Sequence, residues 1–183
     1  MAYLLNQGTS SVSIYRVGKD CVSVERIQAN YPILPTGSNT SQWMAAEIRV
    51  SPNGRFLWTT SRRVCESPSE SCNGTITTFR ISGDGTSMHV VAHTDSGGHC
   101  PRVFEVDPTG SWLVVGNGGI EKPWFSTPAE GIRNVRVLRI NETTGVPARV
   151  AAGRYDMGWG SFGSPGGIAI TGGHRGSNGR RLG

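Results

Sequence analysis

Long hydrophobic runs are absent from this sequence of 183 residues. No stretch of about 18 apolar residues occurs, which excludes a membrane-spanning helix of the usual length. Residues 1–10 (MAYLLNQGTS) lack the basic start and the long apolar middle of a secretory signal peptide. We therefore expect no membrane partner and a cytoplasmic protein.

The composition has little of the Ala, Leu, Glu and Lys blend that favours helices. Instead, 26 glycines and 10 prolines accompany a hydrophobic content of 36%. No apolar pattern with the 3.6-residue period of a helix is present, which excludes a helical repeat protein. The composition therefore favours a turn-rich, all-β protein.

A dense basic patch is also absent, although the formal net charge is +5. Residues 153–183 hold four arginines and one aspartate, a net +3, whereas residues 1–152 carry 14 basic and 12 acidic residues, a net +2. A groove for a phosphate backbone requires clustered basic residues interleaved with aromatic ones. We therefore expect no nucleic-acid partner.

Cysteines at metal-ligand spacing are absent as well. The four cysteines form no CxxC motif and no Cys/His pair at zinc spacing, so we expect neither a metal nor another cofactor. Cys65 and Cys72 flank the loop CESPSESC, which a disulfide could close. This pairing would suit a secreted chain, the alternative to a cytoplasmic one. Three Asn-x-Ser/Thr sequons would also fit secretion, at Asn39, Asn73 and Asn141.

What the sequence does contain is an internal repeat. IRVSPNGRFLWTTSR (48–62) aligns with FEVDPTGSWLVVGNG (104–118) at an offset of 56 residues, and both read as strand, Pro-x-Gly turn and strand. Each unit continues into two further β-rich segments, at 76–85 and 88–93 in the first and at 135–145 and 148–153 in the second. Residues 2–7 and 12–20 align with the second and third strands of these units.

Four short strands in a repeat of about 50 residues are typical of a β-propeller blade. We predict an all-β fold, a partial β-propeller of about two and three-quarter blades of four-stranded antiparallel sheets, in a domain over residues 1–155. The blade parts are 1–30, 43–95 and 99–153. Residues 156–183 form a Gly/Arg-rich tail with too little apolar surface to fold, which predicts disorder.

Two stretches resemble a known family, AAEIRVSPNGRFLWTTSRR (45–63) and HCPRVFEVDPTGSWLVVGNG (99–118). They are similar to the seven-bladed propeller lactonases, which include 6-phosphogluconolactonase and 3-carboxy-cis,cis-muconate cyclase. The family's xPRxFxxxPxG motif is present as PRVFEVDPTG (101–110), and its motif at the end of the second strand as LWTTSR (57–62) and YLLNQ (3–7). The resemblance covers residues 1 to about 150 and implies the C-terminal part of such a propeller.

The resemblance also implies site residues. In the cyclase branch, a His, a Glu and two Arg from successive blades surround the central channel, and Arg62 matches the arginine that ends a second strand. Gln7 falls on the glutamate position, and Arg102 matches the arginine of the PR motif. Because glutamine cannot accept a proton near neutral pH, Gln7 disfavours the acid–base scheme of the cyclases.

Arg62 is also a candidate on physical grounds. Gln7, Arg62 and Gly118 end the second strand of each unit, and radial symmetry brings such positions to one level around the channel. A guanidinium there offers a planar fork for an anion and can stabilise an oxyanion. The alternative is a salt bridge with Glu47 or Glu66. We expect the adjacent Arg63 to be solvated.

Three further residues are candidates for substrate binding. Glu47 starts an innermost strand and could face the channel, and His99 precedes Arg102, although a histidine in a loop is often merely exposed. Trp124, in the insertion EKPWFSTPAEG (121–131), could cap the channel. By contrast, Trp58 and Trp112 fall in paired strands, which predicts packing between blades.

Within this family, Gln7 and the PRVF match (101–104) favour hydrolysis of a small anionic sugar lactone, so the resemblance implies an activity like that of 6-phosphogluconolactonase. Carboxy-cis,cis-muconate cyclisation is one alternative, and a propeller scaffold without catalysis is another. The predicted partner is a small anionic lactone or carboxylate. Open blade edges also predict self-association.

Overall fold

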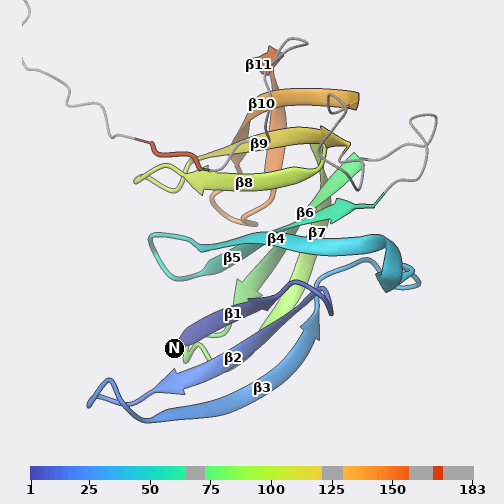
Figure 1. Cartoon of the computed structure of the whole chain (residues 1–183). Helices are drawn as coiled ribbons and strands as arrows, with labels where there is room; N and C mark the ends of the chain where they lie inside the picture. The colour runs from blue at the N-terminus through green and yellow to red at the C-terminus, as the bar shows by residue number, and fades with distance from the viewer. Residues whose placement is uncertain (65–72, 121–129, 157–166, 171–183) are drawn as a thin grey trace, which may run out of the picture.

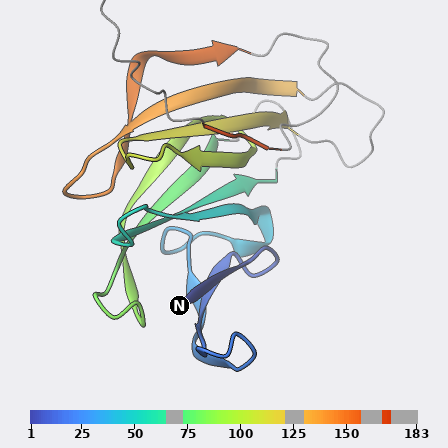
Figure 2. The ribbon, with the colours of Figure 1, turned by 90° about the vertical axis from the view of Figure 1, so that its left-hand side faces the viewer.

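The computed structural model of the chain describes residues 1–64, 73–120, 130–156 and 167–170, and its strands form three antiparallel sheets stacked as successive blades (Figures 1 and 2). Blade 1 is the sheet β1-β2-β3, blade 2 is β4-β5-β6-β7 and blade 3 is β8-β9-β10-β11. A 3₁₀ turn, η1 (Thr40–Gln42), precedes blade 2. The strands are β1 (Ala2–Asn6), β2 (Ser11–Val17), β3 (Val24–Pro32), β4 (Trp43–Val50), β5 (Phe56–Arg63), β6 (Asn73–Ile81), β7 (Met88–His99), β8 (Pro101–Val106), β9 (Trp112–Ile120), β10 (Glu130–Ile140) and β11 (Pro147–Asp156).

These sheets confirm the all-β, partial-propeller prediction. Blade 1 has three strands, and its β1 aligns in the repeat with β5, the second strand of blade 2. Of the predicted tail, Asp156 ends β11 and residues 167–170 belong to no helix or strand. The remaining tail residues lie outside the described part of the chain.

The repeated Pro-x-Gly turns join the first two strands of blades 2 and 3. The amide of Gly54 donates to the carbonyl of Ser51 over 2.8 Å, and that of Gly110 donates to Asp107 over 2.9 Å. Both glycines have positive φ, at 71° and 74°, where a side chain would be strained. The same local chemistry therefore builds the same hairpin 56 residues apart.

Two apolar cores join the blades, one at each interface. Alternation along a strand gives each sheet a forward face, toward the next blade in the chain, and a rear face. In blade 2, Leu57 and Phe79 on the rear face pack with Val12 and Ile14 of blade 1. Phe56, Trp58 and Ile76 on the forward face pack with residues of blade 3, namely Phe104, Leu113, Val115, Leu138 and Ile140.

Each interface also contains an equivalent hydrogen bond, from an aromatic side chain of one blade to a glycine carbonyl of the next. Tyr3 of β1 donates its hydroxyl hydrogen to the carbonyl of Gly85 over 2.9 Å, and Trp58 of β5 donates its indole hydrogen to Gly145 over 2.8 Å. Both glycines lie in the turn between the third and fourth strands of the next blade. Trp58 is fully buried, as expected for packing between blades, whereas Trp112 of blade 3 is 37% exposed.

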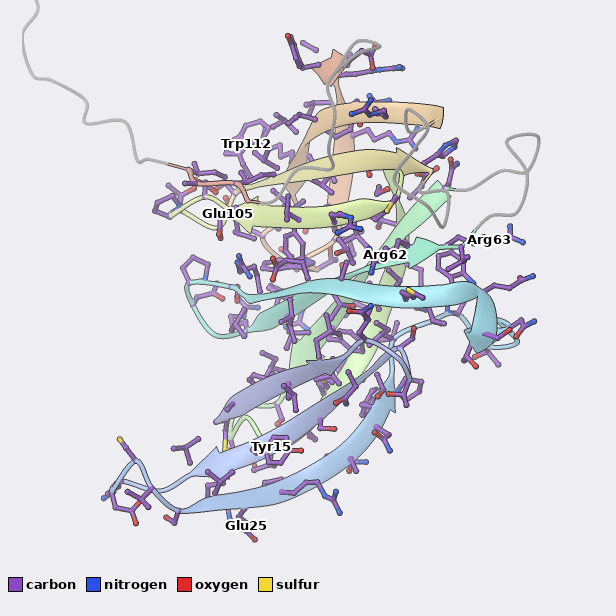
Figure 3. All side chains as sticks on the ribbon, viewed as in Figure 1. Tyr15, Glu25, Arg62, Arg63, Glu105 and Trp112 are labelled. Carbon is purple, nitrogen blue, oxygen red and sulfur yellow. The ribbon has the colours of Figure 1, made fainter. Side chains whose placement is uncertain are left out.

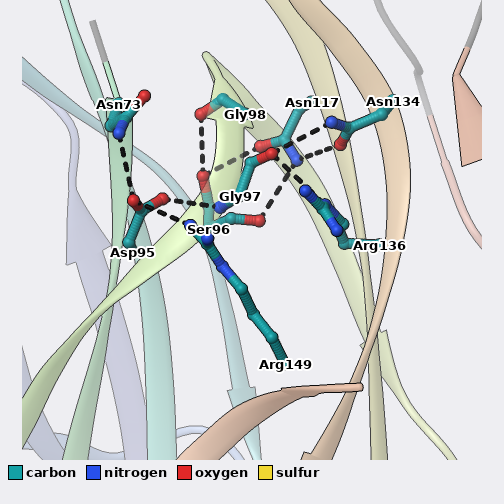
Figure 4. Close-up of polar contacts among 9 residues, drawn as sticks. All are labelled: Asn73, Asp95, Ser96, Gly97, Gly98, Asn117, Asn134, Arg136 and Arg149. Carbon is teal, nitrogen blue, oxygen red and sulfur yellow. Dashed lines mark hydrogen bonds and ion pairs between the residues drawn. The ribbon is translucent and has the colours of Figure 1, made fainter. Parts of the chain in front are cut away.

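A buried polar cluster adds to the contact between blades 2 and 3 (Figure 4). Asn117 of β9 and Asn134 of β10 are fully buried, and the amide of Asn117 donates to Oδ1 of Asn134 over 2.8 Å. The hydroxyl of Ser96, in β7, donates to Oδ1 of Asn117 over 2.9 Å, and the amide of Asn134 donates to the carbonyl of Gly97 over 2.9 Å. Buried polar groups require such partners, so the end of β7 is held firmly against blade 3.

Candidate active site

The ends of the second strands form the centre of the candidate site. Gln7 directly follows β1, and Arg62 is the penultimate residue of β5. Nε2 of Gln7 and Nη2 of Arg62 each lie 3.8 Å from Sδ of Met44, in β4. The structure therefore brings the predicted Gln7 and Arg62 next to the same sulfur atom.

Arg62 extends from the forward face of blade 2. It follows Phe56, Trp58 and Thr60 in the alternation of β5, and Phe56 and Trp58 belong to the core shared with blade 3. Figure 3 shows Arg62 between β5 and β8, with Arg63 extending in another direction. The guanidinium is half-buried and its Nε is shielded from solvent.

Arg102 lies in β8, the strand of blade 3 that packs against β4 and β5. Its Nε, like that of Arg62, is shielded from solvent. The preceding Pro101 meets the forward face of blade 2, because a Cβ built on Gly74 would lie 2.0 Å from its Cδ. Ser61 of β5 pairs with Thr75 of β6, so the next residues along the two strands, Arg62 and Gly74, lie opposite each other. Arg62 therefore extends from the forward face at the same position along the strands as Gly74.

Glu47 participates in an ion-paired network that sequence reasoning did not anticipate. Its Oε1 lies 2.6 Å from Nη1 of Arg49, whose Nε lies 3.1 Å from Oε2 of Glu105. The network joins β4 to β8 across the blade interface. Burial opposes the charge of Arg49, but the hydrogen bond with Glu105 and the charges of both glutamates outweigh it and raise the arginine's pKa. Glu47 therefore has a structural partner in Arg49, and its contact with substrate stays a prediction.

His99 is buried at the end of β7, with 8% of its surface exposed. Burial lowers its pKa, and the nearby charge of Asp95 opposes this shift in part. The imidazole is therefore neutral at pH 7, the form that can accept a proton. Trp124, Cys65 and Cys72 lie outside the described residues, and so does Glu66.

The lowered pKa of His99 predicts a loss of stability in mild acid. Below a pH of about 6.5, the histidine of the unfolded chain takes up a proton that the folded chain binds less well, so the free energy of unfolding falls as the pH falls. His93, whose pKa burial also lowers, contributes in the same direction. Urea unfolding between pH 8 and 5.5 should show a smaller loss for His99→Gln than for the unsubstituted chain. An identical loss in the two proteins would contradict this role of His99.

The described residues contain no cluster of three or more His, Cys, Asp or Glu side chains that could hold a metal ion. Among the same residues, no helix is long and apolar enough to cross a membrane.

A sequence model of the family described as "Lactonase, 7-bladed beta-propeller" matches residues 1–152. The chain belongs to this propeller lactonase family. Among relatives, it is 28% identical over 159 residues to the 6-phosphogluconolactonase of Pectobacterium carotovorum and 32% identical over 113 residues to that of Erwinia tasmaniensis. These alignments cover 87% and 62% of the chain, and 40% and 30% of the two relatives. The chain therefore spans less than half the length of these propeller lactonases.

Two solved structures support the same fold. A putative 6-phosphogluconolactonase from Bacteroides fragilis superposes with a TM-score of 0.60 at 16% identity, over 84% of this chain and 35% of that one. The periplasmic gluconolactonase of Pseudomonas aeruginosa gives a TM-score of 0.61 at 18% identity, over 88% and 39%. Both show the same fold as the three sheets of this chain.

Proposed function

We propose that the protein hydrolyses a small anionic sugar lactone of the 6-phosphogluconolactone type. The observation that carries the proposal is the convergence of Gln7 and Arg62 on Met44, at positions that recur around the axis of a lactonase-family propeller. The names of the relatives support the substrate class.

Hydrolysis would begin with addition of water to the lactone carbonyl carbon, which places negative charge on the carbonyl oxygen. The guanidinium of Arg62 would stabilise that oxyanion, and the amide of Gln7 would orient the substrate or the water. Arg102 would donate hydrogen bonds to oxygen atoms of the substrate. Breaking the ring C–O bond then gives a hydroxy acid, which releases a proton at neutral pH.

His99 is the described imidazole best suited to accept the proton from the attacking water. It precedes Arg102 by three residues, and its lowered pKa keeps it neutral at pH 7. Glu47 and Trp124 remain proposed contacts to the substrate. Muconate cyclisation is less well supported, because Gln7 replaces the carboxylate of that scheme.

Titration of the released acid at constant pH tests the function. With 6-phosphogluconolactone, the chain should accelerate proton release in a saturable way, without added metal or cofactor, and gluconolactone is the unphosphorylated comparison. A rate equal to spontaneous hydrolysis with both lactones would contradict the proposal.

A scaffold role is the second candidate, favoured by exposed apolar side chains on both outer blades. Leu4 and Val24 of blade 1 are 51% and 63% exposed, and Trp112 of blade 3 is 37% exposed although its equivalent in blade 2, Phe56, is buried. The forward face of blade 3 could pack on the rear face of blade 1 in a second copy, as the blades pack within the chain. Self-association thus stays a proposal, as does a cytoplasmic rather than a secreted location.

A further inference from the structure

Blades 2 and 3 carry an arginine at the same paired position, but on different strands. In blade 2, Ser61 pairs with Thr75, so the next pair in register is Arg62 with Gly74. In blade 3, Asn117 pairs with Asn134 and the next pair is Gly118 with Arg133. The arginine and the glycine have therefore exchanged strands between the two blades.

A second repeated contact confirms that the two arginines extend from equivalent faces. The guanidinium of Arg80 stacks over the ring of Phe56 at 4.8 Å, and that of Arg139 stacks over Trp112 at 5.7 Å. Phe56 lies six residues before Arg62, and Trp112 lies six residues before Gly118. Both registers are continuous between these points, so alternation places Arg133 on the forward face of blade 3, as it places Arg62 on that of blade 2.

The exchange has a steric reason in blade 2. A Cβ at Gly74 would lie 2.0 Å from Cδ of Pro101, so the third strand has no space for an arginine and the second strand supplies it. In blade 3, Gly118 leaves the second strand without a side chain, and Arg133 lies directly across from it. Arg133 is 8% exposed, with its Nε shielded from solvent.

Blades 2 and 3 therefore each carry a guanidinium at the same paired position of the forward face, Arg62 in blade 2 and Arg133 in blade 3. In the sequence repeat, Gln7 of blade 1 aligns with Arg62. The guanidinium of an arginine at this position suits a phosphate or carboxylate, because it can donate two parallel hydrogen bonds to two oxygen atoms of the anion. Arg133 is one blade farther along the ring than Arg62, so the two can bind different groups of one extended anion.

We propose that Arg133 binds the phosphate group of the substrate and sets the preference for a phosphorylated over an unphosphorylated sugar lactone. The proposal rests on the proposed function for the identity of the substrate. Anion binding itself does not require turnover, so it can be measured separately.

Calorimetric titration of the chain with 6-phosphogluconate and with gluconate tests this role. We expect tighter binding of the phosphorylated acid, and a loss of about 10- to 100-fold in its affinity on Arg133→Gln, as for removal of one charged hydrogen-bonding partner. The affinity for gluconate should not change. Arg139→Gln is the matched control, because it removes an exposed arginine from the same strand and face, and should leave both affinities unchanged.

An exchange variant, Gly118→Arg with Arg133→Gly, separates phosphate binding from a purely structural role. Gly118 is not among the glycines with positive φ, so its backbone accepts a side chain. Because the variant recreates the arrangement of blade 2, we expect it to recover the preference for the phosphorylated acid to within a few-fold.

Three results would overturn the proposal: an unchanged ratio of the two affinities in Arg133→Gln, a folded exchange variant without the preference, or an unsubstituted chain that binds neither acid. Preferential phosphate binding that depends on Arg133 but occurs without lactone hydrolysis would instead support the site and refute the proposed function.

Discussion

Arg62→Ala is expected to lower kcat/KM for 6-phosphogluconolactone by about 100- to 1000-fold, the usual cost of removing an oxyanion donor. The effect should appear mainly in kcat, because the charge that Arg62 stabilises develops only as water adds to the carbonyl carbon. Rates of proton release measured over a range of lactone concentrations would separate kcat from KM.

Arg63→Ala is the matched control for this prediction. It removes the same side chain from the next residue of β5, which extends in another direction (Figure 3). Arg63 is half-buried like Arg62. We expect the kcat/KM of Arg63→Ala to stay within about threefold of the unsubstituted chain, because only Arg62 is proposed to contact the reacting carbonyl group. Equal losses in the two variants would indicate a general effect of charge and would contradict a specific role for Arg62.

Asn117→Leu is expected to lower the free energy of unfolding by about 3–5 kcal/mol. The substitution removes the donor to Oδ1 of Asn134 and to the carbonyl of Ser96 in a buried cluster (Figure 4), and each such loss costs about 1–3 kcal/mol. The hydroxyl of Ser96 keeps the carbonyl of Gly98 as its acceptor, over 3.0 Å. Denaturant unfolding followed by tryptophan fluorescence measures the change.

Asn6→Leu provides the comparison at the equivalent position of blade 1. Asn6 donates to the hydroxyls of Ser11 and Ser13, over 3.2 and 3.0 Å, but it is only half-buried. Water can replace its hydrogen bonds, so we expect a loss near 1 kcal/mol. An equally large loss for Asn6→Leu would contradict the view that burial between blades 2 and 3 makes the hydrogen bonds of Asn117 more costly to lose.

The blade pattern was predictable from the sequence because its causes are local. Alternating apolar residues define the strands, and the turns at Gly54 and Gly110 define the hairpins. The repeat also aligned Gln7 with Arg62, and the structure places both beside Met44. Their roles toward a substrate stay a prediction.

The contacts between blades were not predictable in the same way. Arg49 and Glu105 are 56 residues apart, and their ion pair depends on how β4 packs against β8. The burial of His99 depends on the extension of β7 against β9 and β10 of blade 3, beyond the segment 88–93 that the apolar pattern indicated. Arg133 could have been found only from the strand register, which pairs it with Gly118.

Chemical rescue is the most direct test of Arg62 as the residue that stabilises the oxyanion. Initial rates of 6-phosphogluconolactone hydrolysis by Arg62→Ala would be measured with and without guanidinium ion, at concentrations far below those that unfold the protein. We predict a slow variant whose rate rises with added guanidinium, and an unsubstituted chain whose rate does not rise. Hydrolysis by Arg62→Ala at the full rate, without any guanidinium, would contradict the role of Arg62.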